Sequence, residues 1–207
     1  LLRVRSLNYE AYTWHVISGR TGSIVSQSDS PMGGLGLSPA FPVGASFKKI
    51  KRNEPILIDF GICYHGYQVD QTRMYAIGSM PEPFTSAFEA CREIHYRVLD
   101  KIIEGLTSKE LFEYSKQLAQ KLGFADVYLG YGHHKVRFLA HGIGIELAEL
   151  PFIAASHTYP IEDGAVIAIE PKMVFPKKGA CGIENTVLIE NGRYRVLTDN
   201  NESIMIL

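Results

Sequence analysis

Two adjacent segments with helical periodicity interrupt a chain that is otherwise rich in β-prone runs. In residues 82–104 and again in residues 108–122, apolar side chains recur at steps of three and four, as in an amphipathic helix. Thr107 and Glu110 form a capping box where the second segment begins. The second apolar stripe consists of Leu111, Tyr114, Leu118 and Leu122. Both stripes need a sheet to cover, so the pattern predicts an α+β fold with helices on one face of an antiparallel sheet.

A hairpin is predicted before these helices, over residues 54–78, because two β-prone runs flank a Tyr-His-Gly turn signal. Asp59 and Asp70 lie on its opposite arms. If the turn holds an even number of residues, both side chains fall on one face, directly opposite or one diagonal step apart. After the helices, residues 136–198 contain further β-prone runs broken by Gly, Pro and Asn, which predict antiparallel strands.

The first fifty residues are less regular. Residues 14–25 combine short β-prone runs with a Gly-rich turn, so about 14 residues are expected to precede the first strand. Residues 27–44 are dense in Pro, Gly and Ser and predict a long loop. A loop of this length is either a flexible connector or the wall of a site.

Composition narrows the class of protein. The 207 residues suit one domain, and 21 Lys and Arg against 22 Asp and Glu give no basic excess for general nucleic-acid binding. Cys63, Cys91 and Cys181 show no metal-binding or disulfide spacing, and Cys91 falls on the first helical stripe, so it is expected in the core. Without an apolar run of about 20 residues we expect no membrane contact and a cytoplasmic location.

Four acidic residues stand inside apolar or Gly-containing strand text. They are Asp59, Asp70, Glu170 and Glu184. A buried carboxylate must be paired, bind a metal or become neutral, and the same segments hold too few Arg or Lys residues to pair all four. Each one alone could lie on a solvated strand face, but together they predict a shared site.

His141 joins this set, because Gly142 and Gly144 let another group approach closely beside it. Oxygen ligands with one imidazole suit Mn, Co, Fe or Zn. Five ligands exceed what one catalytic ion needs, whereas two divalent ions roughly 3.5 Å apart would use all of them. The chemistry predicted is hydrolysis of an amide or ester by a hydroxide that bridges the ions, with a nearby Glu moving protons.

The order and spacing of these motifs resemble the pita-bread metallopeptidases, which include methionine aminopeptidases, prolidases and Xaa-Pro aminopeptidases. The matching elements, from about residue 14 to the end, are DFG, GYQVDQTR, HGIG, IEP and IENTVLI. HGIG and the ELP that follows are most similar to the prolidase and Xaa-Pro aminopeptidase branch. The resemblance implies a curved antiparallel sheet with helices on its outer face, and enzymes that cleave a bond to proline and commonly form homodimers.

The resemblance also assigns roles residue by residue. It implies that Asp59 binds one metal through both oxygens, that Asp70 and Glu184 bridge, and that His141 and Glu170 bind the second metal. Glu170 is implied as the general acid and base. We expect residues 1–207 to form a single catalytic domain. Because the fold normally opens with helices, the first helices and an N-terminal domain are expected to be absent from this sequence.

Four positions depart from the branch. Ala148, Arg137 and Ser26 stand where it usually has His, and Gly182 stands where it often has Arg. These positions belong to the substrate pocket and the groups that stabilise developing charge.

One reading is drift within a working peptidase that acts on a peptide or other small substrate. In that case Arg137 takes over the electrostatic role of the missing imidazole, or His133, His134 or His157 enters the pocket. Two alternatives stay open, a metalloenzyme of other chemistry, such as a lyase or a small-amide hydrolase, and a peptide-binding module without turnover.

Overall fold

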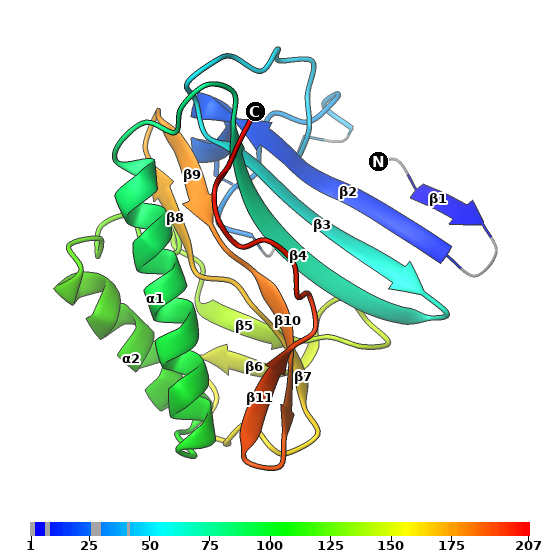
Figure 1. The fold of residues 1–207 in the computed structure, drawn as a ribbon, viewed down its shortest axis with the longest axis vertical. Helices are drawn as coiled ribbons and strands as arrows, with labels where there is room; N and C mark the ends of the chain where they lie inside the picture. Colours follow the sequence, from blue (N-terminus) through cyan, green and yellow to red (C-terminus); the bar gives the residue numbers. More distant parts are fainter. Residues whose placement is uncertain (1–2, 7–8, 26–29, 41) are drawn as a thin grey trace.

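The computed structural model describes all of the chain except residues 1–2, 7–8, 26–29 and 41. Four strands from the first half of the chain and one from its C-terminal end form a five-stranded sheet with the strand order β1-β2-β3-β4-β12. The strands are β1 (Arg3–Ser6), β2 (Tyr9–Ser18), β3 (Ile56–Tyr64), β4 (Tyr67–Ala76) and β12 (Met205–Ile206). All neighbours are antiparallel except β12, which runs parallel to β4. The C-terminal segment, red in Figure 1, therefore returns along the edge of this sheet.

The predicted hairpin is confirmed as β3 and β4. Its turn holds two residues, His65 and Gly66, with φ angles of 50° and 87°. Positive φ at both positions fits the twist of the two strands, and glycine adopts it without strain. Asp59 pairs with Thr72 and Gly61 with Asp70, so the two aspartates lie one diagonal step apart on the same face.

The start of the chain differs from expectation. Strands β1 and β2 begin at Arg3 and Tyr9, well before residue 14. Strand β2 pairs with β3 along its whole length, from Tyr9 opposite Tyr64 to Ser18 opposite Ile56. Tyr9, Tyr12 and Thr13 are residue types enriched in strands, and the length of β3 supplies the hydrogen-bond partners for this part of β2.

The loop after β2 is a structured wall. A 3-10 helix, η1 (Gly19–Ser23), follows β2, and within the described part of the loop Met32 is completely buried in the core. Gly34 pairs with Gly44 across the loop, where a side chain on Gly34 would collide with the backbone of Gly44. Met32 therefore anchors the described part of the loop to the core, and the Gly34–Gly44 bridge joins two parts of the loop to each other.

The two predicted helices are confirmed as α1 (Phe84–Ile103) and α2 (Ser108–Lys121). The predicted stripe of α1 is buried throughout, Cys91 included. The stripe of α2 is rotated from the prediction, because its buried residues include Ser115 and Ala119, whereas Tyr114 and Leu118 are only partly buried. Small side chains let α2 lie close to α1 and the neighbouring strands, and this close packing moves the larger residues to the edge of the contact.

A second five-stranded sheet follows, with the order β11-β10-β7-β5-β6 and antiparallel neighbours throughout. Its strands are β5 (Phe138–Gly142), β6 (Glu149–Ala154), β7 (Val166–Ile169), β10 (Asn185–Glu190) and β11 (Arg193–Val196). A two-stranded ladder of β8 (Lys172–Phe175) and β9 (Gly179–Gly182) lies beneath α1. The α+β class and the antiparallel strands after the helices are thus confirmed.

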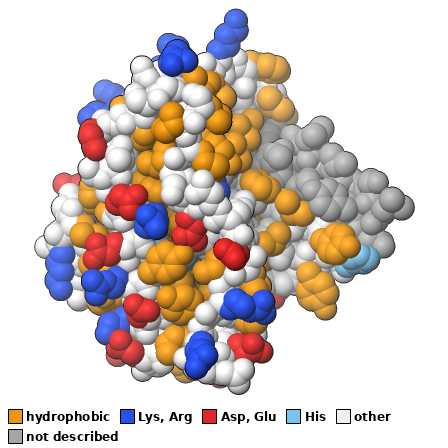
Figure 2. All heavy atoms as spheres, in the orientation of Figure 1, with side chains coloured by type: hydrophobic (Ala, Val, Ile, Leu, Met, Phe, Trp, Pro, Cys, Tyr) orange, Lys and Arg blue, Asp and Glu red, His pale blue; other side chains and the backbone are white. Residues whose placement is uncertain are grey.

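The outer surface agrees with the balanced composition. Lys, Arg, Asp and Glu side chains are interspersed over the face that carries α1 and β11 (Figure 2), without a single-sign patch on that face. Cys63, Cys91 and Cys181 are buried free thiols. In the part of the chain that the structure describes, neither helix combines the length and the apolar character needed to cross a bilayer.

The capping box of α2 provides a test of the local sequence signals. The hydroxyl of Thr107 accepts a hydrogen bond from the N–H of Glu110, and the Glu110 carboxylate accepts one from the N–H of Thr107. We expect Thr107→Ala to lower the free energy of unfolding by about 1 kcal/mol, measured by urea denaturation. Thr107→Ser keeps the hydroxyl and should lose much less. Equal losses in the two variants would show that the cap does not stabilise α2.

Candidate metal centre

The five residues predicted to form a site lie around one cavity of about 340 Å³. Asp59, Asp70, His141, Glu170 and Glu184 all line it. Their exposed fractions lie between 1% and 9%, so these are buried polar groups and not members of solvated strand faces. Residues up to 125 positions apart in the sequence (59 and 184) therefore share one site.

Contacts between strand β4 of the first sheet and the start of strand β10 in the second position two of the acidic residues of this cavity. Thr72 on β4 and Glu184, just before β10, exchange two backbone N–H to carbonyl contacts of 3.4 Å. The Thr72 hydroxyl also donates to Glu184 Oε2 at 2.7 Å. Two positions after Glu184, on β10, the Thr186 hydroxyl accepts from the N–H of Asp70 and donates to its carbonyl. Asp70 and Glu184 are thereby held side by side.

His141 and Glu170 enter from the second sheet. On β5, His141 pairs with Ala168 of β7, and the N–H of Glu170 donates to the carbonyl of Leu139. With its proton on Nδ1, the His141 ring donates to the carbonyl of Gly142 at 3.0 Å, which leaves Nε2 as the acceptor. That Nε2 lies 3.7 Å from Glu170 Oε1, so it faces the acidic cluster.

The backbone of a neighbouring strand approaches Gly142 closely, as its sequence context predicts. A Cβ at this position would collide with the backbone of Leu150 and with the Glu149 carbonyl. Any larger residue would therefore push β5 and β6 apart beside His141.

A sixth residue, the positively charged Lys172, lies inside the cluster and was not predicted from the sequence. Its ammonium donates to Asp59 Oδ2 at 2.8 Å, to Glu170 Oε2 at 2.6 Å and to Glu184 Oε2 at 3.1 Å. The side chain is 1% exposed. The signal was present, since Lys172 is an isolated charge in apolar strand text two residues after Glu170.

Burial and charge act together on the protonation of this cluster. Burial, followed by the charges of Glu184 and Asp59, raises the pKa of Asp70 well above its usual range. Burial raises the pKa of Glu184 to about 7, although the Lys172 ammonium acts against it. Burial alone would lower the pKa of Lys172, but Asp59, Glu170 and Glu184 raise it well above its ordinary value. The carboxylates therefore need further positive charge to ionise fully.

Three of these residues fit a metal ion by their geometry and donor chemistry. Asp70, His141 and Glu184 each offer a ligand atom, and these atoms lie within 4.8 Å of one another. Two carboxylates and one imidazole suit a borderline divalent ion such as Mn, Co, Fe or Zn. A divalent ion there would also supply the positive charge that the cluster lacks.

An apolar wall forms another part of the cavity. It is formed by Phe60, Phe138, Leu147 and Phe152. His157 lies behind this wall, where its ring stacks on Phe152 with an interplanar angle of 18°. Ser30, from the long loop, also lines the cavity, and its hydroxyl is buried without a hydrogen-bond partner among the described residues. A cavity lined by both acidic and aromatic side chains suits a small substrate with both a polar and an apolar part.

Comparison with known families agrees with this geometry. The model of metallopeptidase family M24 matches residues 2–191. The chain belongs to metallopeptidase family M24. The α+β architecture described above is accordingly the pita-bread fold of that family.

Several relatives within M24 are proline-directed peptidases by name. The chain is 34% identical over 165 residues to the Xaa-Pro dipeptidase of Pyrococcus furiosus. The aligned residues make up 79% of this chain and 45% of that protein. Among solved structures, X-Pro aminopeptidase from Thermotoga maritima superposes with a TM-score of 0.76 at 26% identity, over 95% of this chain and 49% of that one. Prolidase from Pyrococcus furiosus gives 0.73 at 27% identity, over 93% and 50%. The chain thus spans about half the length of these M24 relatives.

The positions predicted to depart from the branch, and the residues predicted to compensate for them, lie in different parts of the structure. Ala148 lines the cavity, and Gly182 lies directly opposite Lys172 in the β8–β9 ladder. Arg137 and His133 line a separate pocket against α2, and His134 is exposed with its ring near Tyr131. Ser26 lies outside the described residues. The structure therefore brings together the predicted ligands but does not bring Arg137, His133 or His134 to them.

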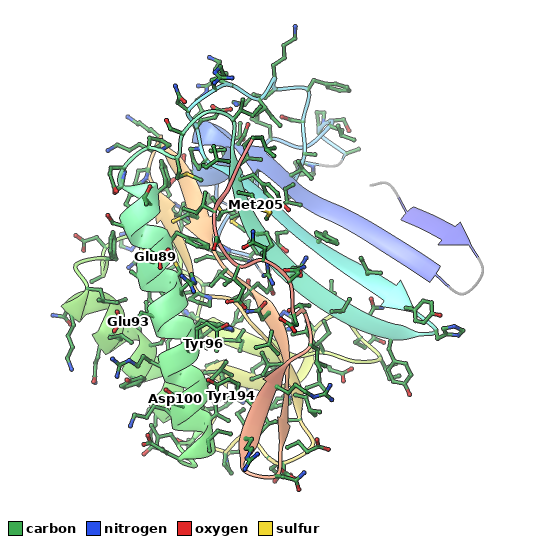
Figure 3. All side chains as sticks on the ribbon, viewed as in Figure 1. Glu89, Glu93, Tyr96, Asp100, Tyr194 and Met205 are labelled. Carbon is green, nitrogen blue, oxygen red and sulfur yellow. The ribbon has the colours of Figure 1, made fainter. Side chains whose placement is uncertain are left out.

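Behind the M24 cluster, a buried network fixes the segment that carries Glu184. Arg73 donates to the Glu184 carbonyl at 2.7 Å and to Asn185 Oδ1 at 2.8 Å. Asn185 donates in turn to Glu202, whose other oxygen accepts from the hydroxyl of Tyr96 on α1 at 2.6 Å. Tyr96 is labelled on α1 in Figure 3. The network ties helix α1 and the C-terminal segment to the backbone of a candidate ligand.

His95 is a neutral member of this network and predicts a pH effect on stability. Its Nε2 accepts from Asn185 at 3.0 Å, and burial, then the charges of Arg73 and Arg92, lowers its pKa from 6.5 to about 3. Between these values the unfolded chain binds the proton and the folded chain does not. Folding should therefore lose about 1.4 kcal/mol per pH unit below 6.5 from this residue.

The measurement is urea unfolding of metal-free protein in chelator from pH 7 to pH 4. The matched variant His95→Gln can still accept from Asn185 but does not titrate. Wild type should lose stability more steeply than the variant as pH falls, because all other titrating groups are shared. Parallel curves of unfolding free energy against pH would show that the pKa of His95 is not lowered in the folded state.

Proposed function

We propose that this chain is the catalytic part of a metal-dependent hydrolase of short peptides, of the Xaa-Pro dipeptidase or aminopeptidase type. The observation that carries the proposal is the buried set of Asp70, His141 and Glu184 in a cavity that aromatic side chains also line. Membership of family M24 and the names of its relatives support the same reaction class.

The candidate ligands divide into two groups. Asp70, His141 and Glu184 meet the distance requirement for one ion. Asp59 and Glu170 lie outside that set and bond to Lys172, which also bonds to Glu184. A divalent ion supplies Lewis acidity, which polarises a carbonyl and lowers the pKa of water. The sequence prediction of two divalent ions requires Asp59 and Glu170 to bind metal as well.

The side chains around the ion have separate tasks. Glu170 is the proposed general acid and base, and its two oxygens lie 3.7 Å from His141 Nε2 and 2.6 Å from Lys172 Nζ respectively. These contacts hold its carboxylate at the cavity wall, where it can move a proton between water and the leaving amine. Phe138, Leu147 and Phe152 provide the apolar surface against which a proline ring would pack.

The acidic side is tested by Asp70→Asn, which keeps the shape of the residue but removes its charge. We expect loss of bound divalent ion, measured by plasma mass spectrometry, and a fall in kcat/KM of at least 10²-fold on Xaa-Pro dipeptides. Asp126→Asn, at an exposed loop position, is the matched control and should change neither quantity.

The outcomes separate this proposal from its alternatives. Metal bound by wild type without cleavage of Xaa-Pro or other dipeptides would indicate a lyase or a hydrolase of small amides. No metal on wild type would favour a peptide-binding module. The cytoplasmic location and the homodimer remain predictions from the sequence, and gel filtration would test the second.

The aromatic wall is tested by Phe152→Ala. Burial of a phenylalanine against a ligand contributes roughly 1.5–3 kcal/mol, so KM for an Xaa-Pro substrate should rise about tenfold or more while kcat changes less. Phe47→Ala, at a side chain that is 87% exposed, is the control. An unchanged KM in Phe152→Ala would place the substrate elsewhere.

A further inference from the structure

The ammonium of Lys172 occupies the position of a cation among the candidate ligands. Its three N–H groups are all used, by Asp59, Glu170 and Glu184, at 2.6–3.1 Å. These three acceptors come from three separate places along the chain. The cluster is therefore arranged around Nζ, as carboxylates are arranged around a bound ion.

The path of the lysine side chain is built into the β8–β9 ladder. Lys172 pairs directly with Gly182. A Cβ on residue 182 would lie 2.6 Å from Lys172 Cγ and 2.8 Å from the carbonyl oxygen of Pro171. Glycine at position 182 thus leaves the space through which the lysine stem reaches the carboxylates, and any other residue there would displace it.

The same oxygens cannot serve the ammonium and a second metal ion together. A metal binds carboxylate oxygens at about 2.0–2.2 Å, so an ion on Asp59 Oδ2 or Glu170 Oε2 would compete with Nζ for those atoms. Two cations so close together repel strongly in a buried site. The Lys172 side chain is 1% exposed, so its charge has no route to solvent without rearrangement of the strands.

We infer that the centre holds a single divalent ion, bound by Asp70, His141 and Glu184, and that the Lys172 ammonium replaces a second ion between Asp59, Glu170 and Glu184. This inference rests on the metal site of the proposed function and specifies its composition. The charges agree with it, because one divalent ion and one ammonium offset three of the four carboxylate charges. Among the described residues that line the cavity, Lys172 is the only Lys or Arg.

The experiment is metal stoichiometry on the whole chain. Metal-free protein is saturated with Mn²⁺, dialysed and analysed by plasma mass spectrometry, and the electron paramagnetic resonance spectrum separates an isolated Mn²⁺ from a coupled pair. Wild type should bind one ion per chain with the six-line spectrum of isolated Mn²⁺. Lys172→Met and Lys172→Ala, which remove the ammonium from Asp59 and Glu170, should bind about two ions with a coupled spectrum. Lys178→Met, at an exposed lysine between β8 and β9, should match wild type.

Each result has a fixed meaning. Two ions per wild-type chain, or none, would overturn the inference, as would one ion in both wild type and the folded Lys172 variants. If those variants fail to fold by circular dichroism, the wild-type stoichiometry and spectrum decide. One ion without peptide cleavage would sink the peptidase proposal and leave this inference standing, whereas two ions with cleavage would do the reverse.

Discussion

Electrostatic repulsion among four buried carboxylates is the constraint on which this structure depends. Asp59, Asp70, Glu170 and Glu184 are each less than 10% exposed and line the same cavity. Without positive charge between them, such groups must hold protons. Burial first, and the charges of neighbouring carboxylates second, raise the pKa values of Asp70 and Glu184. Lys172 supplies one positive charge from inside the protein. The remaining negative charge of the cluster favours the binding of a divalent ion.

Strand pairing and several hydrogen bonds hold these carboxylates in place. The two-residue turn sets the register of β3 and β4, and that register puts Asp59 and Asp70 on one face. The bridge between Thr72 and Glu184 then joins the first sheet to the second. The Arg73 guanidinium donates to the carbonyl of Glu184 and so holds the backbone at the same bridge. A cluster of like charges needs this rigidity, because mobile carboxylates would move apart into solvent.

Much of the fold and the candidate site was predictable from sequence, because local patterns carry it. The hairpin turn, the capping box of α2 and the stripe of α1 depend only on neighbours along the chain. The isolated acidic residues were recognisable because strand interiors rarely accept a charge without a partner. Lys172 satisfied the same criterion, but counting charges within segments could not show that one ammonium would contact three acids. The buried face of α2 was misjudged because close packing favoured Ser115 and Ala119 over larger apolar residues.

The sequence by itself determined which elements form and which side chains carry the chemistry, since periodicity, turn residues and isolated charges are local properties of the chain. Only the tertiary structure decided which of these side chains meet. It placed Lys172 among the acids through the space left by Gly182, and it placed Arg137 and His133 beside α2, away from the acidic cluster. It also extended β2 back to Tyr9, because β3 offered partners along its full length. Contacts of this kind depend on strand register and on free volume between distant segments, and neither quantity can be read from neighbouring residues.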